Sequence, residues 1–203
     1  MRFTFVNTLV EIAKKDRDVI VLLGDLGYGM FDPFFNELPE QIINVGIAEQ
    51  SMTGLAAGLA LEGKKVFTYG TCNFPTMRCL EQIRNDCAYQ KANVKIVSAN
   101  CGLAFKAHGM SHYATEDLAV MRALPNVTVV APADPVESEL LTEAIYKQQG
   151  TCYLRLGKGA EPTIYKEKIN NYVLGKAIKI IEGKKIVFFS TGSITHEVLK
   201  AIE

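Results

Sequence analysis

The chain has 203 residues, of which 48% are hydrophobic and 22% charged, a composition typical of a globular protein with one main core. Lysines plus arginines number 22 and equal the aspartates plus glutamates, so no net charge favours nucleic acid or an anionic membrane surface. A small molecule or another protein is therefore the expected partner.

The five cysteines predict a reducing environment rather than a metal or disulfide site. They are odd in number and contain no C-x-x-C pair of the zinc or redox type. No run reaches the roughly 18 apolar residues of a membrane span, and the N-terminus lacks the unbroken apolar stretch of a signal peptide. We expect a soluble, cytoplasmic protein without a metal site of its own.

Short hydrophobic runs alternate with amphipathic stretches along the first three quarters of the chain. Runs rich in Val and Ile, near-continuously apolar as in strands buried on both faces, predict strands at 19–24, 41–45, 65–70, 94–99, 127–132 and 152–156. Apolar residues at three- and four-residue spacing predict helices at 4–15, 48–62, 74–90, 115–123 and 135–148. This alternation predicts an α/β fold with a doubly wound, mostly parallel six-stranded sheet and helices on both faces.

The periodicity is lost after the last of these strands. We expect a main domain over 1–160, a linker over 161–183, and a new strand, turn and helix from 184 to 203. One strand and one helix cannot bury a core of their own. The final segment is therefore expected to open a second domain that is cut short.

The segment NVGIAEQSMTGLAAGLALEG (44–63) places one carboxylate, Glu49, at the start of a small-residue helix. An acid in a first turn complements the helix dipole, and this structural role is one interpretation. Gly54 and Gly58 make one side of the helix thin, so another backbone can approach it closely. We expect the chain to self-associate or pair with a partner through that face.

A family resemblance gives Glu49 a second interpretation. GIAEQ, a Gly/Ala helix, an aromatic-bearing loop, EQIRND, a histidine before a helix, and LPNVTVVAPAD follow one another in this order. The order resembles the pyrimidine-binding domain of transketolase and 1-deoxyxylulose-5-phosphate synthase, from Arg2 to about Arg155. The resemblance implies thiamine diphosphate as cofactor and transfer of a two-carbon ketol unit between sugars or sugar phosphates.

The resemblance also assigns cofactor-binding residues. Glu49 would hydrogen-bond the aminopyrimidine ring nitrogen and promote the proton transfer that activates the cofactor. Phe74 would stack on the pyrimidine ring. Thr71 or Cys72, and Met77, stand where transketolases carry flanking aromatic residues, which departs from the family pattern.

The implied substrate-binding residues are two histidines and two arginines. His112 falls where the family has a histidine near the substrate hydroxyls, suited to proton transfer, and His108 stands where an acidic residue is usual. Arg155 and Arg2 fall where arginines hold the sugar phosphate, although two solvated surface arginines are the alternative interpretation. Gly109, between the histidines, indicates a loop and argues against a helical metal site.

The diphosphate half of the cofactor site is not expected in this chain. The family holds the diphosphate and Mg²⁺ through a G-D-G motif in a separate domain, and Gly24-Asp25-Leu26 does not reproduce it. Asp25 follows a strand and is still expected to face the cofactor cleft, because ligands bind at the carboxyl ends of such strands. The chain resembles the second subunit of a split transketolase, truncated in its C-terminal domain, which works as a homodimer or heterotetramer with a partner chain.

Two other functions fit the same sequence. The beta subunit of a 2-oxoacid dehydrogenase shares a comparable glutamate and Gly/Ala helix. A noncatalytic assembly subunit with this fold would explain the missing flanking aromatic residues and His108.

Overall fold

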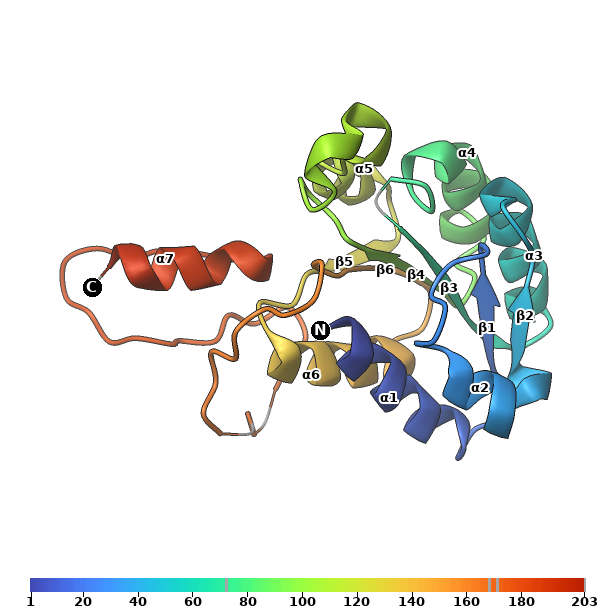
Figure 1. Cartoon of the computed structure of the whole chain (residues 1–203), viewed down its shortest axis with the longest axis horizontal. Coiled ribbons are helices and arrows are strands. Elements are labelled where there is room, and N and C mark those ends of the chain that lie inside the picture. The colour runs from blue at the N-terminus through green and yellow to red at the C-terminus, as the bar shows by residue number, and fades with distance from the viewer. Residues whose placement is uncertain (72, 168, 171, 203) are drawn as a thin grey trace.

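The computed structural model describes residues 1–71, 73–167, 169–170 and 172–202. Its centre is a six-stranded sheet with the order β2-β1-β3-β4-β6-β5, and every neighbouring pair is parallel (Figure 1). The strands are β1 (Val19–Leu23), β2 (Ile42–Asn44), β3 (Lys65–Thr71), β4 (Val94–Ala99), β5 (Val127–Val130) and β6 (Thr151–Arg155). The predicted α/β class and strand number are confirmed.

Seven α-helices lie within the described part of the chain. They are α1 (Arg2–Ala13), α2 (Asp32–Glu37), α3 (Glu49–Leu61), α4 (Leu80–Gln82), α5 (Asp117–Ala123), α6 (Pro135–Lys147) and α7 (Thr195–Ala201). None of the helices that the structure describes is long and apolar enough to cross a membrane. The start of α6 agrees with its sequence signal, because Asp134 Oδ1 accepts a bond of 2.8 Å from the Glu137 amide.

Helices cover both faces of the sheet, which explains the unbroken apolar runs. Helices α1 and α6 pack on one face, and α3, α5 and the segment after α4 pack on the other (Figure 1). In β1, Val21 belongs to the core under α1 and α6, whereas Ile20 and Leu22 belong to the core under α3. Successive side chains of a strand point to opposite faces, so a strand covered twice must be apolar throughout.

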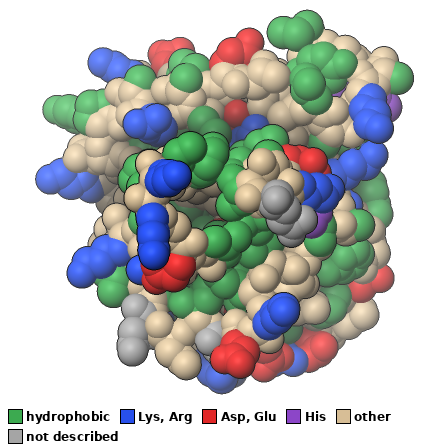
Figure 2. Space-filling view, turned by 90° about the vertical axis from the view of Figure 1, so that its left-hand side faces the viewer, with side chains coloured by type: hydrophobic (Ala, Val, Ile, Leu, Met, Phe, Trp, Pro, Cys, Tyr) green, Lys and Arg blue, Asp and Glu red, His purple; other side chains and the backbone are tan. Residues whose placement is uncertain are grey.

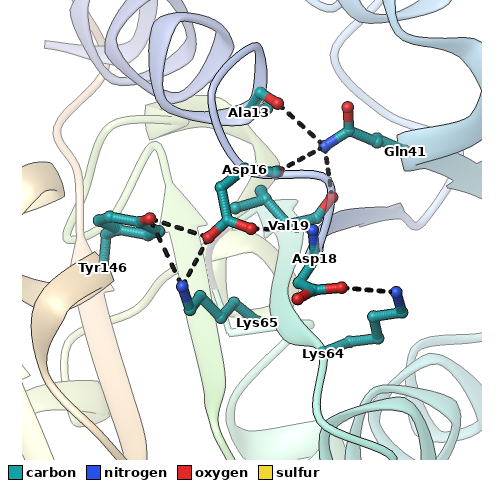
Figure 3. Close-up of polar contacts among 8 residues, drawn as sticks. All are labelled: Ala13, Asp16, Asp18, Val19, Gln41, Lys64, Lys65 and Tyr146. Atoms are coloured by element: carbon teal, nitrogen blue, oxygen red, sulfur yellow. Dashed lines mark hydrogen bonds and ion pairs between the residues drawn. The ribbon is translucent and has the colours of Figure 1, made fainter.

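A polar network ties the amino ends of two strands to the helices (Figure 3). Lys65 Nζ, at the start of β3, lies 2.5 Å from Asp16 Oδ2 in the loop before β1. The Tyr146 hydroxyl of α6 donates to the same carboxylate oxygen at 2.8 Å. The Gln41 amide donates to the carbonyl oxygens of Ala13, Asp16 and Val19, which closes the end of α1.

The helix predicted over 74–90 is the least accurate element of the main domain. Turns occupy 73–76 and a 3-10 helix Met77–Cys79, α4 begins only at Leu80, and the chain continues as a π-helix over Ile83–Ala88. Pro75 packs back onto β3, because a Cβ on Gly70 would lie only 2.9 Å from Pro75 Cγ. This close approach holds the loop, and Phe74 with it, at the end of β3.

The strand predicted from 184 does not form within the described residues. Residues 184–190 form bends and irregular structure and leave Val187, Phe188 and Phe189 exposed. Figure 2 looks onto this side of the molecule and shows hydrophobic side chains gathered on it. A strand needs a partner for its backbone groups, and an isolated apolar run supplies none. The helix expected after it does form, as α7, while the domain division remains a prediction.

Candidate functional site

The carboxyl ends of the parallel strands gather most of the candidate residues. Strand β1 lies between β2 and β3, so the connection that leaves β1 for β2 and the one that leaves β3 for β4 run in opposite directions. Such a reversal of strand order opens a crevice at the carboxyl ends, where open α/β sheets bind ligands. Asp25 follows β1, Glu49 follows β2, the loop with Phe74 follows β3, and the loop with His112 follows β4.

Glu49 is the first residue of α3 and is buried, with 3% of its surface exposed. A Cβ on Gly24 would lie 3.6 Å from Glu49 Cγ, so the small residue at the end of β1 leaves room for the carboxylate. The helix amino end favours a negative charge there, in agreement with the dipole interpretation. A buried carboxylate still needs a hydrogen-bond donor.

That donor is Arg78, which sequence reasoning missed. Its Nη1 lies 3.0 Å from Glu49 Oε2, and its Cζ lies over the Phe74 ring, 4.4 Å from the ring centre. A flat cation with N–H donors is therefore held between an aromatic face and a buried carboxylate. The same two groups fit the aminopyrimidine of thiamine diphosphate, a flat ring that stacks and shares a hydrogen bond.

Two histidines and a second phenylalanine extend this group. The His112 ring meets Phe74 edge to face with centroids 5.2 Å apart, and it lies 4.9 Å from the His108 ring. Phe105 contacts both histidines at 5.2 and 5.4 Å. Ser111 Oγ lies 2.9 Å from His112 Nδ1, which leaves proton exchange with a ligand to Nε2. The structure thus brings together Phe74, His108 and His112.

Asp25 is tied to the end of β2. Its carboxylate accepts a bond of 3.1 Å from Asn44 Nδ2, and its amide donates to Asn44 Oδ1 at 3.1 Å. These bonds hold Asp25 at φ 56, a left-handed conformation in which Asp and Asn are enriched. The Asn44 bond, with one from Tyr28, lowers the pKa of Asp25. Asp25 therefore lies at the carboxyl end of β1, where its carboxylate and its amide are both bonded to Asn44.

Thr71 and Met77 differ in their surroundings. The Thr71 hydroxyl is buried, donates to the Ala99 carbonyl at 3.2 Å and accepts from Asn100 Nδ2 at 2.8 Å. It joins the ends of β3 and β4. Met77 is exposed at the start of the 3-10 helix before α4. Cys72, the alternative to Thr71, lies outside the described residues.

Arg155 is not a solvated surface arginine. Its Nε donates to Asp117 Oδ2 at 2.8 Å, and its Nη2 donates to the Ala114 carbonyl at 3.1 Å. Asp117 is fully buried and also accepts a bond of 2.6 Å from the Tyr153 hydroxyl. Arg155 therefore anchors the loop that carries His112 to the end of β6.

Arg2 lies at the start of α1, apart from the Arg155 contacts. A Cβ on Gly159 would lie 3.3 Å from Arg2 Nη2, so this glycine gives the guanidinium room. Burial raises the pKa of Tyr69 to about 12, and the nearby Arg2 opposes part of this rise. Arg2 Nε is buried and has no hydrogen-bond partner among the described residues.

Among the described residues, no group of three or more His, Cys, Asp or Glu side chains is placed to hold a metal ion. The four cysteines that the structure describes, Cys79, Cys87, Cys101 and Cys152, are buried free thiols. Burial raises the pKa of Cys87 and of Cys101 to about 12, which disfavours the nucleophilic thiolate form.

Similarity to known proteins agrees with this geometry. The sequence profile of the family described as "Transketolase, pyrimidine binding domain" matches residues 1–162. An apulose-4-phosphate transketolase subunit of Phocaeicola vulgatus is 35% identical over 201 residues, 98% of this chain and 64% of that protein. The 6-deoxy-6-sulfo-D-fructose transketolase subunit of a Clostridium species is 34% identical over 204 residues, 100% of this chain and 63% of that protein.

Solved structures give the same result. A split-gene transketolase, described as an inactive beta4 tetramer, superposes with a TM-score of 0.88 at 35% identity, over 98% of this chain and 64% of that one. A transketolase of Pichia stipitis shares the fold, with a TM-score of 0.66 at 22% identity, over 76% of this chain and 25% of that one. The chain thus spans less than two thirds of the length of these relatives. It belongs to the transketolase pyrimidine-binding domain family.

Proposed function

We propose that this chain is the pyrimidine-binding half of a thiamine diphosphate-dependent transketolase, transferring a two-carbon ketol unit between sugars or sugar phosphates. The observation that carries the proposal is the buried Glu49 carboxylate beside the Phe74 ring, already holding a flat donor between them. Family membership supports the choice of cofactor. When bound, the cofactor supplies a nucleophilic carbon for breaking and forming carbon–carbon bonds.

The proposal assigns a separate role to each residue of the site. Glu49 shares a hydrogen bond and its proton with the pyrimidine ring nitrogen, while Phe74 fixes the plane of the ring. His112 holds or moves a proton at a substrate hydroxyl through Nε2, because Ser111 engages Nδ1. His108 contacts His112 and lies at the substrate side of the same group.

The diphosphate and Mg²⁺ are assigned mainly to a partner chain or domain. Large apolar side chains surround the crevice on loops that follow three strands, and this pattern favours a protein partner there. The exposed residues are Tyr28 after β1, Ile47 after β2, and Leu103 and Met110 after β4. Homodimerisation through the Gly54 and Gly58 face, and a cytoplasmic location that suits free thiols, belong to the same proposal.

The phosphate-binding task proposed for the two arginines is the weakest fit. Arg155 already uses two of its nitrogens within the chain, whereas Arg2 has a buried nitrogen without a partner among the described residues. Arg2 is therefore the better candidate for holding a substrate phosphate by a charge-assisted bond.

The test is reconstitution with a chain that carries the diphosphate motif. We expect the mixture, with thiamine diphosphate and Mg²⁺, to transfer a ketol unit from a ketose to an aldose and not to decarboxylate a 2-oxoacid. The isolated chain should be inactive, because most of the cofactor's charge lies in a diphosphate that needs a bound cation and donors.

Glu49→Gln is the decisive variant within this assay. We expect turnover to fall about 100-fold or more, since the amide cannot share a proton with the pyrimidine as a carboxylate does. The fold should persist, because the amide oxygen can still accept the Arg78 bond. Full activity of the Glu49→Gln mixture, with an unchanged thermal melt, would contradict the proposed role.

A further inference from the structure

Arg78 makes within the chain both contacts that the proposed function reserves for the pyrimidine ring. It donates to Glu49 Oε2 at 3.0 Å, and its guanidinium lies over the Phe74 ring at 4.4 Å. A guanidinium is planar and delocalised, with N–H donors in its plane, and an aminopyrimidine carries the same N–C–N unit. The guanidinium thus resembles the ring in its planarity and in its N–C–N unit.

The side chain of Arg78 can leave this place without moving the backbone. It is 46% exposed, whereas the Glu49 side chain is only 3% exposed. The Arg78 carbonyl accepts a bond of 3.0 Å from Gln50 Nε2, and its amide donates to Asn73 O at 3.4 Å. The backbone is thus held on both sides while the guanidinium has a path to solvent.

Burial of Glu49 explains why such a residue is useful. An ionised carboxylate out of water is costly unless a donor faces it. Arg78 supplies that donor when no ring is present. A bound ring supplies it instead when its ring nitrogen carries a proton, so the carboxylate faces a donor in both states.

We propose that Arg78 is an internal competitor, which the cofactor's pyrimidine ring displaces from Glu49 and Phe74. The residue thereby sets the affinity of this half-site for the ring. This inference rests on the proposed function, since it takes Glu49 and Phe74 as the ring's contacts. It gives a second reason, beside the missing diphosphate site, for weak cofactor binding by the chain alone.

The experiment is a ligand-observed NMR titration of the full 203-residue chain with hydroxymethylpyrimidine, the pyrimidine half of thiamine. This probe has no diphosphate, so the result does not depend on a partner chain. We expect Arg78→Ala to bind it about tenfold more tightly than the unchanged chain, because a stacked and ion-paired competitor has been removed. The control is Arg84→Ala, whose exposed arginine donates to the neighbouring Asn85 and should not change binding.

A second variant keeps the test possible if the first one does not fold. Arg78→Ala leaves the buried Glu49 without its donor, so a thermal melt accompanies each titration. If that variant unfolds, Arg78→Gln takes its place in the titration. Glutamine keeps a hydrogen-bond donor for Glu49 but lacks the positive charge and the planar guanidinium. We then expect a smaller increase in affinity, about threefold.

The outcomes separate this inference from the proposed function. Tighter binding by the Arg78 variants that is lost when Glu49→Gln is added supports both. Unchanged or weaker binding by the Arg78 variants, with Glu49-dependent binding by the unchanged chain, overturns the competitor role alone. Binding to no variant, or binding that ignores Glu49 throughout, overturns the proposed function and this inference with it.

Discussion

Asp117 joins strand β6 to the loop that carries His112. Its Oδ2 accepts bonds from the Tyr153 hydroxyl at 2.6 Å and from Arg155 Nε at 2.8 Å, and Arg155 in turn holds the Ala114 carbonyl. Asp117 is fully buried, and the Arg155 side chain is only 16% exposed. The pair therefore has a structural task on which the position of His112 depends.

We expect Asp117→Asn to lower the free energy of unfolding by about 3 kcal/mol, because it leaves a largely buried cation without its counter-charge. Urea unfolding measures the change. Glu116→Gln is the control, since Glu116 is exposed and its carboxylate bonds its immediate surroundings, including the Thr115 hydroxyl; its effect should stay within about 0.5 kcal/mol. A loss below about 1 kcal/mol for Asp117→Asn would show that Arg155 finds another partner.

Elements with a local signal could be predicted from the sequence. The run VIVLL and the start of α6 at Asp134-Pro135 depend on neighbouring residues, and the structure confirms both. The loop at 73–79 could not be predicted, because it depends on Pro75 packing against Gly70 in β3. The run from 184 has the composition of a strand, but pairing is a property of two segments.

In the candidate site, too, some residues could be predicted from the sequence and others depend on contacts between distant segments. The family resemblance predicts Glu49 and Phe74 as site residues, whereas their contact with the same side chain needed the structure. Arg78 carries no signal of its own, since it bonds a carboxylate 29 residues away along the chain. Its position depends on the non-α-helical segment before Leu80, where the sequence pattern predicted an α-helix from 74.

The network at the amino ends of β1 and β3 makes stability depend on pH. The bond from Lys65 is the main cause that lowers the pKa of Asp16 below its usual 3.8, with smaller contributions that include Tyr146. A lowered pKa means that the unfolded state binds the proton more readily. Asp16 therefore stabilises the fold above about pH 4, and this contribution is lost as the pH falls through the folded-state pKa.

Asp16→Asn should remove this contribution. We expect a loss of about 1 to 2 kcal/mol in the free energy of unfolding at pH 7, and a smaller difference between variant and unchanged chain at pH 3. Urea unfolding at both pH values measures it. Asp18→Asn is the control, because its ion pair with Lys64 is exposed and contributes little. An equal loss at both pH values would contradict the assignment to Asp16.

The thin side of α3 suits the proposed self-association. Gly58 is exposed, and a Cβ added there would meet nothing within 4 Å in the single chain; the same holds for Gly54. Glycine within a helix costs roughly 0.5 to 1 kcal/mol relative to alanine. Nothing within the described chain compensates for this cost, which suits a face that another backbone approaches in the assembly.

Gly58→Ala should consequently raise the stability of the monomer and lower the affinity of its self-association. In the monomer at low concentration, we expect unfolding to require about 0.5 to 1 kcal/mol more, because helix propensity rises and no clash occurs. Self-association, followed by sedimentation over a range of concentrations, should weaken about tenfold, since an added methyl group overfills a close backbone contact. Asn7→Ala is the matched control: Asn7 is exposed on α1, which covers the opposite face of the sheet, and its replacement should raise helix stability without changing association. If Gly58→Ala stabilises the monomer and leaves association unchanged, the face of α3 is not the interface, and the exposed loops at the carboxyl ends of the strands become the surface to test.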